Sequence, residues 1–123
     1  MTKTTKADFA LFKKECRRWL VKFGLVGWDV AFEHKDCDGS CATAALNASQ
    51  HYAVITLGTD MAGYNFYGKE SIKAWAFHEV CHVLFADYSD LAQRREYSAS
   101  EHDRVEHAII VTLENVLYAN EKK

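Results

Sequence analysis

Apolar side chains recur every three or four residues from Ala7 to Phe23, which is the spacing of one buried face of an amphipathic helix. Lysines and arginines occupy the other face of this segment. After Gly24 and Gly27 the pattern changes, because apolar and polar residues alternate from Trp28 to His34 as they do in a half-buried strand. The chain therefore begins with a predicted helix that is followed by a predicted strand.

Two more strands are predicted from Ala42 to Ser49 and from Tyr52 to Leu57. The polar segment from Lys35 to Ser40 contains Asp38-Gly39, a pair that is typical of tight hairpin turns. We therefore expect the three strands to follow one another in a short antiparallel three-stranded sheet, as a meander.

Two helices are predicted in the second half of the chain. A loop rich in Gly, Asp and Asn runs from Thr59 to Gly68, and a largely buried helix follows from about Glu70 to about Ala86. A polar connection is expected from Asp87 to Ser100. The last helix is predicted from about Ser100 to Tyr118, and its apolar face contains Val105, Ala108, Ile109, Leu113 and Val116.

Length and composition indicate one soluble domain. A chain of 123 residues is close to the usual size of a single domain, and 49% hydrophobic with 26% charged residues is an ordinary globular balance. Residues 1–123 are thus predicted to form one α+β domain. The net charge of −2 gives no global reason to expect binding to nucleic acid or to an anionic membrane.

The compartment is predicted from two absences in the sequence. No apolar run is long enough for a signal-peptide core or a membrane-spanning helix. The four cysteines lack the density and the regular spacing of a secreted disulfide scaffold. We therefore expect a cytoplasmic protein with reduced thiols that does not enter a membrane. The oligomeric state has no signal in the sequence.

The second predicted helix, from about Glu70 onward, contains the motif His78-Glu79-Val80-Cys81-His82. Histidines four residues apart lie one helical turn apart on the same face, where one metal ion can contact both imidazoles. Glu79 lies beside the first histidine, close enough to take a proton from a water molecule that the metal activates. The motif predicts a zinc site with His78 and His82 as ligands and Glu79 as general base and acid. Two histidines held by local hydrogen bonds, with Glu79 facing solvent, are the structural alternative.

A catalytic zinc usually has three protein ligands, so a third residue is required. The last helix offers a cluster of metal-ligating residue types: Glu101, His102, Asp103, Glu106 and His107. At about 100° per residue, Glu106 falls on the flank of the apolar face, whereas His107 points roughly away from it. Glu106 is our predicted third ligand, with His102 as the second choice. Either residue can instead be an ordinary surface side chain.

The segment from Ala76 to Leu84, which carries the motif, resembles the active-site helix of the zincin metallopeptidases. The later Arg104-Val105-Glu106-His107 resembles the glutamate-bearing helix of the gluzincin branch. In layout the chain is similar to small metallopeptidase-like proteins encoded by phages and prophages. This resemblance implies a minimal zincin-like fold, zinc as cofactor, hydrolysis of a peptide or protein substrate, and His78, His82 and Glu106 as ligands. The glycine and third histidine of the metzincin branch do not follow His82.

Two further roles are implied by the same resemblance. Zincins hold the substrate as an added strand on an edge strand beside the active-site helix, a role that would fall to Ala42 to Ser49. Tyr97 would act as a second electrophile that donates a hydrogen bond to an oxyanion. A plain structural strand and an ordinary packing tyrosine explain the same residues.

Two other functions remain open on sequence grounds. Peptide deformylases also use this helical motif, but with a cysteine as third ligand, and Cys41 stands upstream at a broadly suitable distance. A separate metal clip of Cys37 and Cys41 is disfavoured, since structural zinc sites usually need four ligands. The chain can also be a zinc-stabilised binding protein without activity, in which the basic face of the first helix contacts a partner such as nucleic acid. That face contains Lys13, Lys14, Arg17, Arg18 and Lys22.

Overall fold

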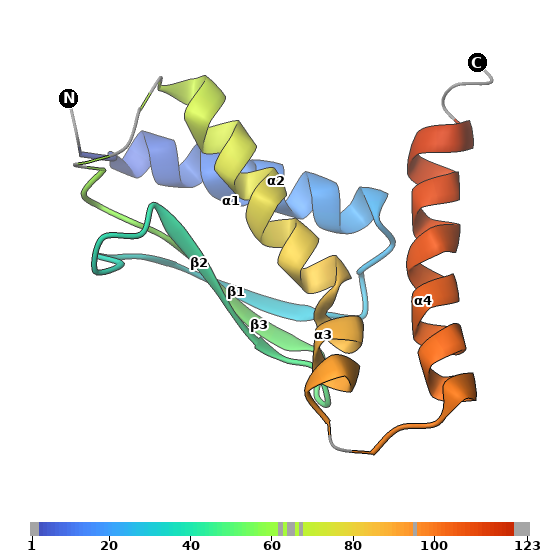
Figure 1. The fold of residues 1–123 in the computed structure, drawn as a ribbon. Coiled ribbons are helices and arrows are strands. Elements are labelled where there is room, and N and C mark those ends of the chain that lie inside the picture. The colour runs from blue at the N-terminus through green and yellow to red at the C-terminus, as the bar shows by residue number, and fades with distance from the viewer. Residues whose placement is uncertain (1–2, 62, 64–65, 67, 95, 120–123) are drawn as a thin grey trace.

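The computed structural model describes residues 3–61, 63, 66, 68–94 and 96–119. It has the predicted α+β class, with helices and one mixed sheet (Figure 1). In chain order the elements are α1 (Lys6–Lys22), β1 (Asp29–His34), β2 (Ala42–Asn47), β3 (Tyr52–Leu57), α2 (Lys69–Leu84), α3 (Ala86–Gln93), α4 (Ala99–Leu113) and a π-helical turn, η1 (Glu114–Tyr118).

Helix α1 begins at a capping box. The Thr5 side chain accepts from the backbone N–H of Asp8, and the Asp8 carboxylate accepts from the backbone N–H of Thr5. Most of the apolar positions predicted from the spacing are buried, Phe9 and Trp19 are partly buried, and Phe12 and Cys16 are completely inaccessible to solvent. The helix ends at Phe23, next to Gly24, whose φ of 70° suits glycine.

The strand order is β1-β3-β2, so the predicted antiparallel meander is wrong. Strand β3 lies in the centre, parallel to β1 and antiparallel to β2. The Asp-Gly turn does form, with positive φ at Asp38 and Gly39 and a hydrogen bond from Ser40 N–H to the Cys37 carbonyl. However, the strands on either side of this turn do not pair with each other.

The loop after β1 instead passes across the end of β3. His34 of β1 and Ala42 of β2 both lie opposite Leu57, one on each side of β3. Beyond them the Lys35 N–H donates to the Leu57 carbonyl and the Gly58 N–H donates to the Cys41 carbonyl, at 3.2 and 2.8 Å. The physical reason is burial: β3 is the most apolar strand, and a central position removes it from water most completely.

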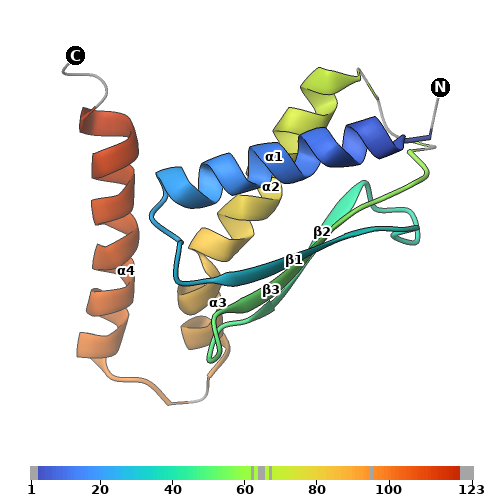
Figure 2. The same ribbon diagram turned by 180° about the vertical axis from the view of Figure 1, so that it is seen from behind.

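Helices α1 and α2 lie together on one face of the sheet (Figures 1 and 2). Ala53, Ile55 and Leu57 of β3 project into this layer and are completely buried. Between the two helices, the Cys16 thiol donates to the Ala76 carbonyl at 3.8 Å. The core therefore lies under the middle of α2 and fixes the orientation of that helix.

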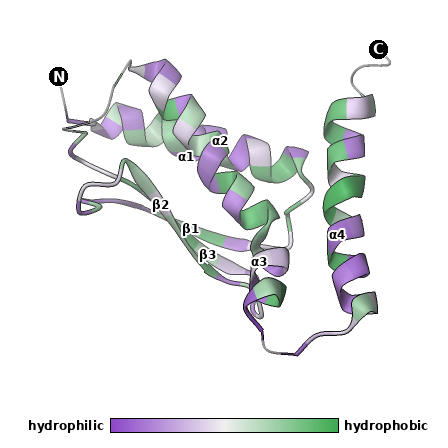
Figure 3. Ribbon diagram, in the orientation of Figure 1, coloured by the Kyte–Doolittle hydropathy of each residue, from purple (hydrophilic) through white to green (hydrophobic). Residues whose placement is uncertain are grey.

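The segment after α2 differs from the expectation in one respect. Residues Ala86–Gln93 form helix α3 within what we predicted as a connection, and Leu91 anchors it in a buried position. Helix α4 then stands beside the end of the other layers (Figures 1 and 2), hydrophilic near its start and more hydrophobic further along (Figure 3). Among the described residues, none of the helices combines the length and the apolar character needed to cross a bilayer.

Candidate metal and substrate site

Helix α2 holds the two motif histidines side by side on its exposed surface. The His78 and His82 rings meet edge to face, with 5.0 Å between centroids and 73° between planes. They line a shallow hollow together with Phe77, Cys81 and Phe85. Two neighbouring imidazoles that are open to solvent fit a zinc ion as two of its protein ligands.

Glu79 points the other way, into the protein, and is only 5% exposed. Burial raises the pKa of its carboxyl group, and the nearby His78 and His82 act in the opposite direction. Burial raises the pKa of the thiols of Cys16 and Cys41, and the charge of Glu79 adds to both shifts.

Glu106, the predicted third ligand, is exposed on α4 and is not assembled with the histidines. Within the described ranges, no three His, Cys, Asp or Glu side chains form a group that could hold a metal ion. His78 and His82 therefore fit zinc as two of its ligands, and the described residues do not place a third ligand beside them.

The packing of α4 explains why Glu106 stays apart. Val105 and Ile109 are the buried residues of α4, and they face a cavity whose opposite wall contains Leu84. Further along, Leu113 lines a second cavity with Phe77. On α2, the histidines lie roughly 110° to 150° further round the helix than Phe77 and Leu84. The side of α2 that faces α4 is therefore not the side that carries the motif histidines.

His102 and Tyr97, two other predicted site residues, lie together at the corner between α3 and α4. The His102 ring is 6.4 Å from the Tyr97 ring and 5.6 Å from the Tyr88 ring, centroid to centroid. These three residues line one small cavity, whose described lining does not include His78 or His82. Their roles as a ligand and as an oxyanion donor stay predictions.

Strand β2 is an edge strand of the sheet, as the role of substrate-holding strand requires. Among the described residues it pairs with β3 alone, so its other side leaves backbone groups available to an added strand. Cys41 lies just before it and is half-buried. Cys37 is near the same turn, where its thiol donates to the Lys35 carbonyl at 3.7 Å.

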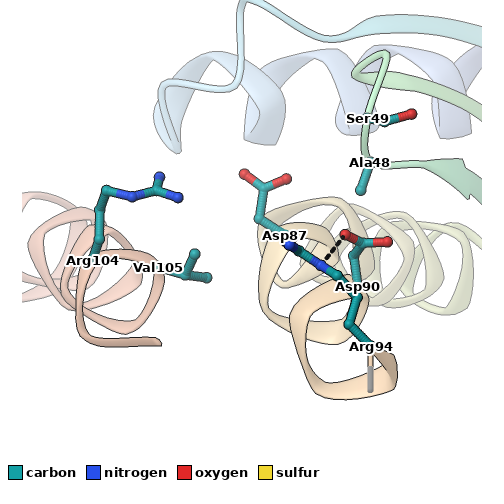
Figure 4. A pocket seen from close by; sticks show the side chains of 7 residues that line it. All are labelled: Ala48, Ser49, Asp87, Asp90, Arg94, Arg104 and Val105. Atoms are coloured by element: carbon teal, nitrogen blue, oxygen red, sulfur yellow. Dashed lines mark ion pairs between the residues drawn. The ribbon is translucent and has the colours of Figure 1, made fainter. Parts of the chain in front are cut away.

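A charged cleft that the sequence did not reveal lies between α3, α4 and the turn after β2 (Figure 4). Arg94 pairs with Asp90 at 3.3 Å and with Glu101 at 3.2 Å. The Arg104 side chain extends from α4 toward Asp87 on the opposite wall (Figure 4). The residue types were visible in the sequence, but their meeting depends on α3, which we had predicted as a connection.

The basic face of α1 is formed as predicted, and aromatic rings support several of its cations. Lys13 lies over Phe9, and Arg17 lies over Phe32 of β1, at 4.7 and 5.2 Å from the ring centroids. Such contacts are consistent with an ordinary solvent-exposed helix face, which accounts for these cations without a bound partner. Binding of a partner by this face stays a prediction.

Comparison of the chain with protein-family models, with curated proteins and with solved structures gave no match.

Proposed function

We propose that this protein is a zincin-like, zinc-dependent hydrolase of the gluzincin type that cleaves peptide bonds in a peptide or protein substrate. The observation that carries the proposal is the arrangement on α2. Two exposed imidazoles 5.0 Å apart flank a glutamate that is 5% exposed and whose pKa is raised. In this proposal His78 and His82 hold the metal, and Glu106 completes the ligand set.

Zinc, when bound, lowers the pKa of water to about 7 and polarises a carbonyl group. In this proposal Glu79 is the general base and acid. Because burial raises its pKa, the Glu79 carboxylate accepts a proton more readily than an exposed glutamate does. It can return that proton to the leaving amine.

The substrate is proposed to lie along the free edge of β2. Main-chain hydrogen bonds from the edge would orient an extended peptide without requiring a particular side chain. The hollow beside the histidines is shallow, which supports cleavage of a peptide or an extended segment of a protein rather than capture of a compact small molecule. A cytoplasmic location is also proposed, and the unpaired state of all four cysteines supports it.

Zinc affinity and peptide cleavage should be measured on wild type and on His82→Ala and Glu79→Gln. We expect wild type to bind zinc and cleave, His82→Ala to lose both properties, and Glu79→Gln to bind zinc without cleaving. His107→Ala is the matched control, since it removes an exposed histidine of α4. Absence of zinc binding by wild type would rule the proposal out.

A deformylase-like amide hydrolase is the second candidate function. It is favoured by one observation, which is that Cys41 is half-buried just before β2, the strand that contacts α2. In this case Cys41→Ser weakens zinc binding and Glu106→Gln does not. The reverse result selects the gluzincin-type site.

A further inference from the structure

Helix α2 carries an apolar stripe on its outer side that the described chain covers only in part, where the Phe77 ring contacts the Trp19 and Phe23 rings of α1 at 4.8 and 6.1 Å between centroids. Ala74, Phe77, Cys81 and Phe85 follow one another at helical spacing and line the hollow that also contains the motif histidines. Phe77 is 40% exposed and Phe85 is 42% exposed. The opposite side of α2 forms the core, so apolar residues lie on two sides of this helix, and the outer one is mostly open to solvent.

Helix α4 and its extension η1 carry a second exposed apolar stripe. Ile110 is 45%, Leu113 36% and Leu117 61% exposed, and their spacing puts them on one flank. Glu106 stands at the start of the same flank, one turn before Ile110. Leu113 and Leu117 line a cavity with Phe77 of α2 and with residues of α1, so this flank already faces one edge of the stripe on α2.

Helix α4 is loosely packed against the rest of the protein. Cavities of about 350, 120 and 230 Å³ follow one another between α4–η1 and the remaining elements. Figure 4 shows the first of them, with Arg104 and Val105 on one wall and Asp87 on the other. These cavities are open to solvent, and among the described elements outside the α4–η1 helix itself α3 makes the most extensive contacts with α4, so a small displacement of α4 breaks few contacts.

We propose that α4 closes over the outer side of α2, so that Ile110, Leu113 and Leu117 cover Phe77, Cys81 and Phe85. By helical geometry, the stripe on α2 is only about 55° round the helix from the side that α4 already faces. Closure removes both stripes from water and needs no change in the direction of either helix.

The same movement brings Glu106 toward the motif, and this second step rests on the proposed zinc site. The cavities pair Phe77 with Leu113 and Leu117, and they pair Leu84 with Val105 and Ile109. The two helices therefore run antiparallel. Along their axes, His82 of α2 lies opposite about residue 109 or 110 of α4. Glu106 is then roughly one turn, about 5 Å, from the level of His82. A glutamate side chain spans that offset.

The first test uses the native thiol of Cys81 in metal-free protein. Ile110→Cys places a thiol on the closing flank, and Val111→Cys places one on another side of α4 at similar exposure, 38% against 45%. Under mild oxidation we expect a disulfide from position 81 to position 110 within one chain, mapped by mass spectrometry. Equal yields in the two variants, no link, or a link between two chains would overturn closure.

The second test separates closure from the metal site. Ile110→Asp should weaken zinc binding at least tenfold, although residue 110 is not a ligand, because it prevents closure. Val111→Asp should bind zinc as wild type does. Equal affinity in the two variants overturns the coupling of Glu106 to closure. If wild type binds no zinc, the proposed function fails, and the disulfide experiment alone decides whether α4 closes.

Discussion

The His34 ring stacks on the Phe9 ring, with 5.0 Å between centroids and 13° between planes. The Thr4 hydroxyl donates its proton to the Gly58 carbonyl at 2.6 Å, so the His34 Nε2–H must donate to the Thr4 oxygen, 2.7 Å away. This contact joins the segment before α1 to the end of the sheet. Burial lowers the pKa of His34 below 6.5, and Asp8 partly opposes the shift.

The His34 environment predicts a pH dependence of stability. A histidine whose folded pKa is lowered binds a proton more readily in the unfolded chain, so stability is lost as the pH falls below about 6.5. We expect the difference in unfolding free energy between wild type and His34→Gln to be larger at pH 7.5 than at pH 5. Urea denaturation at both pH values measures it. An unchanged difference would show that His34 is not responsible.

The buried Glu79 predicts a stability cost at the motif. A carboxylate held away from water with a raised pKa destabilises the folded state at neutral pH. Glu79→Gln, without zinc, should therefore melt a few degrees higher than wild type. Glu106→Gln is the control, because Glu106 is exposed, and it should leave the melting temperature unchanged. A lower melting temperature for Glu79→Gln contradicts the prediction.

Gly58 predicts a steric limit at the end of β3. A Cβ atom there would lie 2.8 Å from the Ser40 carbonyl oxygen and 3.0 Å from that of Cys41. Both contacts are with backbone, which cannot turn aside as a flexible side chain can. Gly58→Ala should reduce the unfolding free energy by about 1–3 kcal/mol. Gly27→Ala, where no atom lies within 4 Å, is the control, and equal losses in both variants would refute the argument.

The start of α4 depends on a second capping box. The Ser98 oxygen accepts from the Glu101 N–H at 3.1 Å, and the Glu101 carboxylate accepts from the Ser98 N–H at 3.2 Å. Ser98→Ala should cost about 1 kcal/mol. Because α4 is loosely packed, hydrogen exchange should increase in α4 before it increases in α2. Uniform acceleration across the chain would mean that α4 and the core unfold together.

Local structure was predicted well from the sequence wherever the spacing of apolar residues within one segment was sufficient to distinguish a helix from a strand. The apolar spacing of α1, ending beside Gly24, predicted the helix closely, and Tyr52 to Leu57 is strand β3 with the predicted bounds. The Asp38-Gly39 turn was also right in its own geometry. Strand order was wrong because a tight turn does not determine pairing. The most apolar strand, β3, occupies the central position of the sheet because that position buries it most completely.

Prediction of the site was limited by long-range packing. The motif spacing was sufficient to place His78 and His82 side by side, since one helix contains both. A helical wheel could show which flank of α4 carries Glu106, but not which side of α2 that helix approaches. That choice is made by Val105 and Ile109, which face Leu84 across a cavity in the present arrangement.

The central position of β3 also has a consequence for the order in which the sheet is made. Each β1 residue pairs with a β3 residue 23 positions later, as Asp29 does with Tyr52 (52 − 29). During synthesis, β1 and β2 must leave the ribosome and wait without their sheet partner until β3 emerges. The β2–β3 hairpin can then close locally, and β1 joins it over a longer loop at a greater entropic cost. The last strand to be translated is thus the one on which both earlier strands assemble.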